Sequence, residues 1–370
     1  MRKVIVLWIA IFVVACSKEK EYLNNIKQEL RKVADWQLEH FDYQVAKGSQ
    51  WPDSHARWAW TNATLYIGMA EWATLSDDKK YWDFLYAAGE SNEWKTGSNI
   101  YFADDICVTQ AYCLLYEKCG QQKMIAPSIK TLDSIMNHPA TGSLSYYAEN
   151  SHARWCWCDA LFMAPAAFAR LGKITGNRQY FDFLASEYRV TYDSLYCPEE
   201  HLFFRDTRYI SMKEENGKPV FWGRGNGWVV GGLTFLIDHL PADHPSREWF
   251  ISLFRDMMSR IADLQNQQGL WHPSLLDPVA YPMSESSGSA FFIYSMLWGI
   301  NHNYLDRQTY GPRAERGWKA LCNKVDANGK LGYVQAIGAD PKKVGPDDTD
   351  VYGVGAFLLA GCEMYKYLKK

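Results

Sequence analysis

The 370-residue sequence predicts an all-α protein, an (α/α)6 barrel of six helical hairpins, and three observations support this prediction. Apolar residues recur with the 3.6-residue period of a helix, as at Ile26, Leu30, Val33 and Leu38. Alternating strand patterns are scarce. Loops rich in Trp, Asp, Arg, Gly or Ser recur before every second predicted helix, which indicates a repeated hairpin.

The periodicity gives twelve helices, which pair into the six hairpins. Their ranges are 21–42, 57–76, 78–93, 103–120, 122–138, 157–172, 177–192, 225–240, 245–264, 284–303, 305–324 and 349–368.

Two kinds of helix alternate along the chain. The helices that follow the polar loops carry runs of small residues, such as Val229-Val230-Gly231-Gly232, which allow the close packing of an inner ring. Partners such as 245–264 and 305–324 carry more charge, as an outer ring would. A helical solenoid is the alternative, but it would spread polar residues along a concave face. The loops therefore predict one functional mouth, where the inner helices start, within a single domain at 25–370.

One short segment interrupts the helices. The strand patterns His201–Tyr209 and Pro219–Trp222 flank the turn pair Asn216-Gly217 and predict a small β-hairpin insertion near 200–222.

The first residues predict an export signal rather than part of the fold. Arg2 and Lys3 precede a short apolar run, and the residues Val13-Val14-Ala15-Cys16 resemble the lipobox of bacterial lipoproteins. We therefore expect a signal peptide at 1–15, acylation of Cys16 and a polar tether through residue 24. A plain signal peptide that merely ends near a cysteine is the alternative. This implies an exported lipoprotein on the periplasmic or cell-surface side of a membrane.

Composition limits the partners. The net charge of -3 shows no basic field for nucleic acid. Aromatic residues make up 15% of the chain; most belong to the core, but a subset is expected to stack on sugar rings. The cysteines beyond Cys16 sit mainly in apolar helices and are expected to be small buried thiols. Cys156-x-Cys158 with His152 lacks the usual zinc spacing, so no metal is expected.

The candidate catalytic groups are carboxyls at helix starts. Asp159 lies within the mostly apolar run from Arg154 to Met163, directly after Trp155-Cys156-Trp157-Cys158, where poor solvation would raise its pKa and keep it protonated as a general acid. Asp105 stands at the equivalent place one hairpin earlier, and paired carboxyls are the minimum equipment for glycosidic chemistry. Helix capping alone is the alternative for each of these residues, as for Asp104 and Asp350.

Other polar residues at the predicted mouth are candidates for binding. Arg224 stands between two glycines and could fork onto a carboxylate, the alternative being a structural salt bridge. A purely structural role is equally open for Glu285 with Ser286, for His272 and for Tyr352. The glycine-rich run at 222–228 lacks the context of a nucleotide site.

Six motifs resemble glycoside hydrolase family 105, the unsaturated rhamnogalacturonyl hydrolases, which are similar to the unsaturated glucuronyl hydrolases of family 88. They run in order from about residue 50 to the C-terminus, and their shared order is more specific than any one of them. They are Phe102-Ala103-Asp104-Asp105-Ile106, Trp157-Cys158-Asp159-Ala160-Leu161-Phe162-Met163-Ala164-Pro165, Phe221-Trp222-Gly223-Arg224-Gly225-Asn226-Gly227-Trp228, Gly269-Leu270-Trp271-His272, Ser284-Glu285-Ser286-Ser287-Gly288 and Val351-Tyr352-Gly353-Val354-Gly355-Ala356.

The resemblance implies the same barrel and a hydration reaction without a cofactor. The substrate would end in a Δ4,5-unsaturated uronic acid left by a polysaccharide lyase. Asp159 would protonate C4, water would add at C5, and the hemiketal would open to release the sugar. Asp105 matches the second family carboxylate. Arg224 would then neutralise the uronate.

The substrate pocket implied by the resemblance is mostly aromatic. Trp157 would be a stacking wall, and the predicted binding residues also include Trp58, Trp222, Trp228 and Arg205. Arg205 stands in the insertion, where some relatives have His, which makes the linked sugar uncertain among pectin, ulvan, arabinogalactan and glycosaminoglycan types.

Other functions stay open on this fold. An epimerase or isomerase would need His acid–base pairs, whereas the nine His are scattered. A non-catalytic glycan-binding lipoprotein needs aromatics but no buried acid. A conventional inverting glycosidase or a lyase is also possible.

Overall fold

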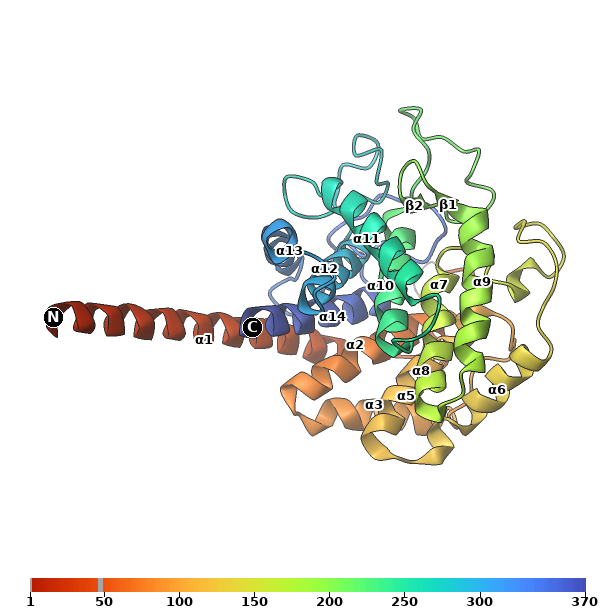
Figure 1. Cartoon of the computed structure of the whole chain (residues 1–370), viewed down its shortest axis with the longest axis horizontal. Coiled ribbons are helices and arrows are strands. Elements are labelled where there is room, and N and C mark those ends of the chain that lie inside the picture. The colour runs from red at the N-terminus through yellow and green to blue at the C-terminus, as the bar shows by residue number, and fades with distance from the viewer. Residues whose placement is uncertain (1, 46–48) are drawn as a thin grey trace.

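The computed structural model describes the backbone of residues 2–45 and 49–370, with side chains for 20–45 and 49–370. In this part of the chain, twelve long helices alternate between an inner and an outer ring (Figure 1). Each inner helix contacts the next, and the last contacts the first, so the inner ring closes. The predicted (α/α)6 barrel is thus confirmed.

The helices of the inner ring are α2 (Trp60–Ser76), α5 (Thr109–Cys119), α8 (Pro165–Thr175), α10 (Gly223–His239), α12 (Ser286–Asn301) and α14 (Val351–Lys369). Those of the outer ring are α1 (Arg2–Glu39), α3 (Lys79–Ser91), α6 (Ala126–Asn137), α9 (Gln179–Leu195), α11 (Arg247–Asp263) and α13 (Arg307–Cys322).

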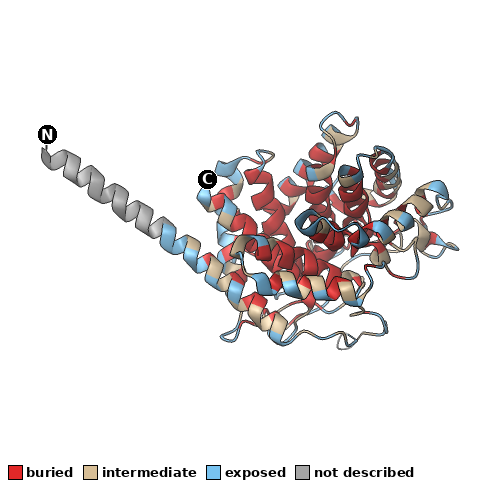
Figure 2. Ribbon diagram, turned by 90° about the horizontal axis from the view of Figure 1, so that it is seen from below, coloured by how far each residue is buried: buried red, intermediate tan, exposed pale blue. Residues whose placement is uncertain are grey.

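Burial separates the two rings as the small and charged residues predicted. Every residue of α12 is buried, and so are the first fifteen residues of α10, whereas the outer helices carry exposed faces (Figure 2). A Cβ added to Gly68 of α2 would lie 2.2 Å from the Gly355 carbonyl of α14, so these two backbones touch. Only glycine allows this approach, which closes the ring between its first and last helices.

Two inner helices are interrupted near the mouth. A short helix α4 (Ala103–Ile106) precedes α5, and α7 (Ala160–Met163) precedes α8. Pro165, at the start of α8, has no N–H to continue the hydrogen bonds of α7. Two 3-10 turns, η1 (Gln122–Met124) and η2 (Ser151–Ala153), complete the helical elements.

The β-hairpin lies earlier than predicted. Strands β1 (Tyr196–Cys197) and β2 (Leu202–Phe203) form an antiparallel pair, while the predicted partners 201–209 and 219–222 do not pair as strands. Trp222 bridges instead to Ser274, and Pro219 makes an isolated bridge with Lys213. The turn at Asn216-Gly217 is present, with Gly217 at a φ of 79°.

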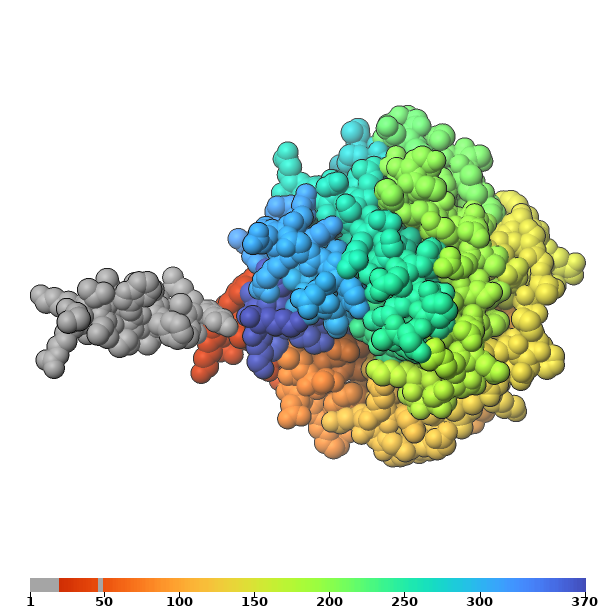
Figure 3. Space-filling view, viewed as in Figure 1, coloured from red at the N-terminus to blue at the C-terminus, as the bar shows by residue number. Residues whose placement is uncertain are grey.

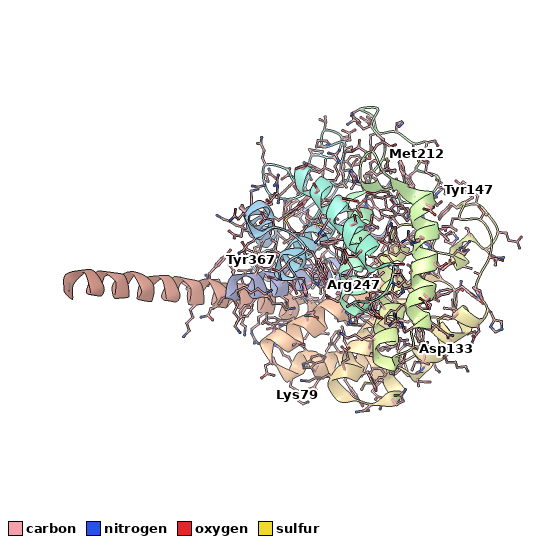
Figure 4. The ribbon with its side chains drawn as sticks, in the orientation of Figure 1. Lys79, Asp133, Tyr147, Met212, Arg247 and Tyr367 are labelled. Carbon is pink, nitrogen blue, oxygen red and sulfur yellow. The ribbon has the colours of Figure 1, made fainter. Side chains whose placement is uncertain are left out.

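Two loops beside the hairpin reach into solvent. Tyr147 and Met212 lie on these loops, are 83% and 46% exposed, and are labelled in Figure 4. The same loops bring Tyr146 and Arg208 together at the barrel mouth, as the next subsection describes.

The predicted signal peptide and the lipidation site Cys16 lie among residues whose side chains fall outside the described part of the chain. The predicted helix at 21–42 lies within α1, apart from its last three residues. No helix among the described residues is both long and apolar enough to cross a membrane.

The cysteines beyond Cys16 are unpaired, and most are buried, as expected for small core thiols. The buried ones are Cys107, Cys113, Cys156, Cys158 and Cys362. The side chains described contain no group of three or more His, Cys, Asp or Glu that could hold a metal ion.

Candidate active site

Aromatic rings tie the starts of the inner helices together at one end of the barrel. Trp60, at the start of α2, lies 5.1 Å from Tyr352 of α14 and 5.6 Å from Trp228 of α10, measured between ring centroids. Phe102, just before α4, lies 5.3 Å from Trp157, just before α7. The predicted mouth is therefore a real assembly of distant segments, and Trp60 and Phe102 join the residues that the motifs singled out.

A pair of carboxyl groups, Asp104 and Asp159, stands at this mouth. Burial and the neighbouring negative charge of Asp159 raise the pKa of Asp104 to about 8. Burial also raises the pKa of Asp159, while Arg205 and Arg224 act in the opposite direction. The Asp159 side chain keeps 11% of its surface exposed, so it remains reachable from solvent. At neutral pH Asp104 is therefore mostly protonated, and Asp159 holds its proton more tightly than an exposed aspartate does.

The Asp105 carboxyl is held by the loop that precedes α4. Its carboxylate accepts a hydrogen bond of 2.8 Å from the backbone N–H of Asn99 and lies against Gly97, where a Cβ would be 2.1 Å from its Cγ. Burial raises its pKa, and the carboxylate that adds to this is Asp53 rather than Asp159. The neighbour of Asp159 at the start of α4 is thus Asp104, and Asp105 holds the preceding loop.

An arginine cluster faces the carboxyl pair from the insertion. Arg205 Nε lies 3.6 Å from Asp159 Oδ2, and its Nη1 donates to Asp206 at 2.7 Å. Arg208 also pairs with Asp206, at 2.8 Å, and its guanidinium lies 3.5 Å from the ring centroid of Tyr146. Because two guanidinium groups share the fully buried Asp206, the cluster carries a net positive charge beside Asp159.

Asn226 explains how the insertion is held in place. Its side-chain oxygen accepts a hydrogen bond from Phe203 N at 2.8 Å, and its side-chain amide donates one to Phe203 O at 3.1 Å. Asn226 therefore satisfies both backbone groups of this β2 residue. Arg205 follows two residues later, and its carbonyl accepts from Cys158 N at 2.8 Å. These bonds join α10, the hairpin and the residue before Asp159.

Arg224 is buried and already occupied. It is 1% exposed, and its guanidinium donates to the backbone carbonyls of Gln335 and Ala336 and to the Tyr352 hydroxyl. It also packs on Trp222, with 4.6 Å from Cζ to the ring centroid. The fork predicted to take the substrate carboxylate is used to hold the 335–336 backbone, although its charge still reaches Asp159. The side chain nearest to the carboxyl pair with charge to offer is Arg205.

Gln335 is the centre of this support and was missed from the sequence. Trp222 Nε1 donates to its side-chain oxygen at 3.2 Å, and the Tyr352 hydroxyl donates to its carbonyl at 2.5 Å. Its N–H donates to Glu285 Oε1 at 3.0 Å. It lies in a loop with no periodic pattern, between α13 and α14, so nothing in the sequence marked it.

Glu285 caps α12 and Ser286 holds a neighbouring loop, the structural roles that the sequence left open as the alternative. Glu285 accepts from Ser287 N at 2.9 Å and from Gly288 N at 2.7 Å, which satisfies the start of α12. The Ser286 hydroxyl donates to Gly332 O at 2.7 Å. Both side chains are buried and hold backbone rather than facing the carboxyl pair.

The remaining predicted residues divide between the mouth and its surroundings. Trp157 packs against Phe102 and His152 and walls the site. Trp228 is fully buried beneath Trp60. His272 is held by Tyr281 O and Asn266, with no contact to the carboxyl pair.

Trp58 also lies apart from the carboxyl pair. It lines a separate hollow on the flank of the barrel.

The opposite end of the barrel holds a different kind of cavity, of about 380 Å³, lined by the later turns of the inner helices. Lys366 there pairs with Glu363 at 2.7 Å and with Glu71 at 3.4 Å. Burial lowers the pKa of His239 to about 3, so it is neutral beside Arg170. None of the predicted site residues lines this cavity.

Comparison with known proteins shows the family of this chain. The family model of Glycosyl Hydrolase Family 88 matches residues 29–368. An unsaturated 3S-rhamnoglycuronyl hydrolase from Alteromonas sp. (strain LOR) is 36% identical over 346 residues, which are 90% of this chain and 83% of that protein.

Solved structures share the whole barrel. A glycosyl hydrolase family 88 protein from Bacteroides vulgatus has a TM-score of 0.83 and 30% identity, with 93% of this chain and 99% of that chain covered. A family 105 glycoside hydrolase from C. acetobutylicum shares the fold, with a TM-score of 0.73, 22% identity, and 92% and 99% coverage. This chain therefore belongs to glycosyl hydrolase family 88 and is a glycosidase of the unsaturated uronyl hydrolase type that families 88 and 105 share.

Proposed function

We propose that this hydrolase uses Asp159 and Asp104 to hydrate the C4=C5 double bond of an unsaturated uronic acid at the non-reducing end of a lyase product. One observation carries the proposal: the buried carboxyl of Asp159 lies 3.6 Å from Arg205 in a positively charged arginine cluster, and its charge acts on the neighbouring buried carboxyl of Asp104. Two such carboxyl groups can supply both an acid and a base to neighbouring atoms of the substrate.

Arg205 tunes the acidity of Asp159. In the free enzyme its charge acts on both carboxyls, and Asp159 lies 3.6 Å away. When a substrate carboxylate pairs with Arg205, the stabilisation of ionised Asp159 weakens and its pKa rises further. Substrate binding thereby favours the protonated form of Asp159.

The reaction then follows with its atoms balanced. Asp159 donates its proton to C4, and positive charge develops at C5 next to the ring oxygen. A water molecule adds its oxygen to C5 and returns one proton to the Asp159 carboxylate. The hydroxyl proton of the C5 hemiketal passes to the ring oxygen as the bond between C5 and that oxygen breaks, which leaves a ketone at C5 and a hemiacetal at C1. The hemiacetal then collapses to an aldehyde: the bond from C1 to the linked sugar breaks, and the hemiacetal proton leaves with the sugar as its hydroxyl. No redox partner is needed.

Arg205 and Arg208 bind the uronate carboxylate in this proposal, in place of Arg224. Both lie at the mouth with side chains 15% and 22% exposed, whereas Arg224 is bonded to backbone carbonyls. A guanidinium can donate two hydrogen bonds to one carboxylate, which orients the ring over the carboxyl pair. Trp157 provides the flat wall for that ring.

The glycan is proposed from the relative and the charge of the site. The Alteromonas relative is named for a 3S-rhamnoglycuronyl substrate, and the arginine cluster suits a substrate with more than one negative charge. We therefore place ulvan-type oligosaccharides with a 3-sulfated rhamnose first, ahead of pectin, arabinogalactan and glycosaminoglycan types.

Export and lipidation form a separate proposal, supported by the lipobox-like residues that end at Cys16. Incorporation of labelled fatty acid into the expressed full chain tests it. Label retained after Cys16→Ser would contradict acylation at this residue.

The function itself is tested with purified protein and lyase digests of each glycan. The conjugated double bond of the unsaturated uronate absorbs in the ultraviolet, and its hydration removes that absorbance. Loss of absorbance together with a released saturated sugar is expected on the ulvan digest. Constant absorbance on every digest would overturn the proposal.

A further inference from the structure

A hollow of about 750 Å³ lies on the flank of the barrel, next to the mouth. Three segments enclose it: the approach to α2, the loop between α3 and α4, and one side of α6. The α6 helix lies on the outside of the barrel in Figure 1 and Figure 3. The volume of the hollow falls in the range of small-molecule binding sites.

Two short stretches of chain connect the lining of the hollow with the barrel mouth. Trp58 lines the hollow, and Trp60, two residues on, packs against Tyr352 at the mouth. Gly97 also lines the hollow and lies directly against Asp105, the neighbour of Asp104. A saccharide that leaves the carboxyl pair over this part of the rim would enter the hollow.

The lining has the chemistry of a saccharide subsite. The indole of Trp58 offers a flat apolar face for the C–H side of a sugar ring. Ser98 and Ser134 offer hydroxyl groups that make no hydrogen bond to another of the described residues. Lys130 of α6 is exposed and forms no ion pair with a carboxylate among the described side chains, so its charge is free for an anionic group.

We propose that this hollow, the flank groove, binds the reducing-end sugars of lyase products longer than a disaccharide, with a sulfate or carboxylate on Lys130. The inference rests on the proposed function, because the same oligosaccharide places its unsaturated end at Asp159. It makes the enzyme prefer longer anionic chains, and it assigns Trp58 to these distal sugars rather than to the uronate.

The test compares an unsaturated disaccharide with a tetrasaccharide from the same lyase digest. We expect the kcat/KM of the wild type to be higher for the tetrasaccharide. Lys130→Ala should reduce this value roughly threefold or more, and Trp58→Ala roughly 5- to 10-fold, the scale of one stacking or charged contact. The kcat/KM for the disaccharide should change by less than about twofold with Lys130→Ala.

The chain offers matched controls in another hollow, which Trp82 and Lys118 line away from the mouth. Lys118 lies 5.4 Å from the Trp82 ring centroid, so Trp82→Ala and Lys118→Ala remove the same residue types without touching the flank groove. We expect both controls to keep the preference for the tetrasaccharide.

Three results would overturn the inference. One is equal kcat/KM of the wild type for the two lengths; another is equal losses on both substrates in Lys130→Ala and Trp58→Ala. The third result is independent of turnover and uses a saturated sulfated tetrasaccharide, which lacks the double bond. Calorimetry should show that this ligand binds the wild type and binds Lys130→Ala more weakly. Absence of binding to the wild type would contradict the flank groove. If no digest is turned over but this ligand binds, the proposed function fails and the groove stands.

Discussion

Arg205 Nε lies 3.6 Å from Asp159 Oδ2, although the two residues come from an insertion and an inner helix start. This relationship places the positive charge of the insertion directly on the candidate acid. The positive charge of Arg205 also offsets part of the rise in the pKa of Asp159 that burial causes. The predictions below follow from this pair and its neighbours.

Asp159→Asn removes the group that transfers the proton and should lower kcat by at least about 100-fold, the usual contribution of a general acid. The ultraviolet absorbance of an unsaturated disaccharide measures the rate. Binding of the substrate should survive, because the arginine cluster is unchanged. Retention of more than a tenth of wild-type kcat would contradict the assignment.

Asp104→Asn and Asp105→Asn form a matched pair of neighbouring substitutions. Asp104→Asn should lower kcat by at least about 10-fold, because an amide can neither donate nor accept a proton in the reaction as a carboxyl group does. Asp105→Asn should lower the melting temperature, since Asn99 N loses its charged acceptor, while kcat changes by less than about threefold. The reverse order of effects on kcat would return the second catalytic role to Asp105.

The helices and the carboxyl at position 159 were predictable because both depend on local pattern. Apolar spacing and small residues define the inner helices, and the aromatic run before Asp159 marks its setting. The choice between Asp104 and Asp105 was not predictable, because consecutive residues on a helix point about 100° apart and the sequence does not give the rotation of α4. The role of Gln335 and the hydrogen bonds of Arg224 were not predictable either, because they join residues more than a hundred positions apart in the sequence.

The pH dependence of stability should reveal the titration of the Asp104 carboxyl. Its pKa in the folded protein is about 8, above the value of about 3.9 in an unfolded chain. The folded state therefore holds the proton more tightly, so this stabilisation is complete below pH 4 and is lost as the pH rises toward about 8. Asp104→Asn should have a higher melting temperature than the wild type at pH 9, and a similar one at pH 4. Equal melting temperatures at pH 9 would show that Asp104 does not titrate in this window.

Arg224→Lys should lower the stability of the protein more than it weakens substrate binding. The ammonium cannot donate to the carbonyls of both Gln335 and Ala336, and a buried carbonyl left unpaired costs about 1–3 kcal/mol. Chemical denaturation should report that loss in the free energy of unfolding. A large rise in KM with unchanged stability would instead place Arg224 on the substrate.

Arg205→Met and Arg205→Lys separate the two effects of this arginine. Both remove the fork, so KM for the charged disaccharide should rise roughly 10- to 100-fold in each, the value of charge-assisted hydrogen bonds. Only Arg205→Met removes the charge that lowers the pKa values of Asp159 and Asp104. Its profile of kcat/KM against pH should therefore shift to higher pH, because both carboxyls then hold their protons more tightly, whereas the profile of Arg205→Lys should stay close to that of the wild type. Identical pH profiles for the two variants would mean that Arg205 binds substrate without controlling the proton of the carboxyl pair.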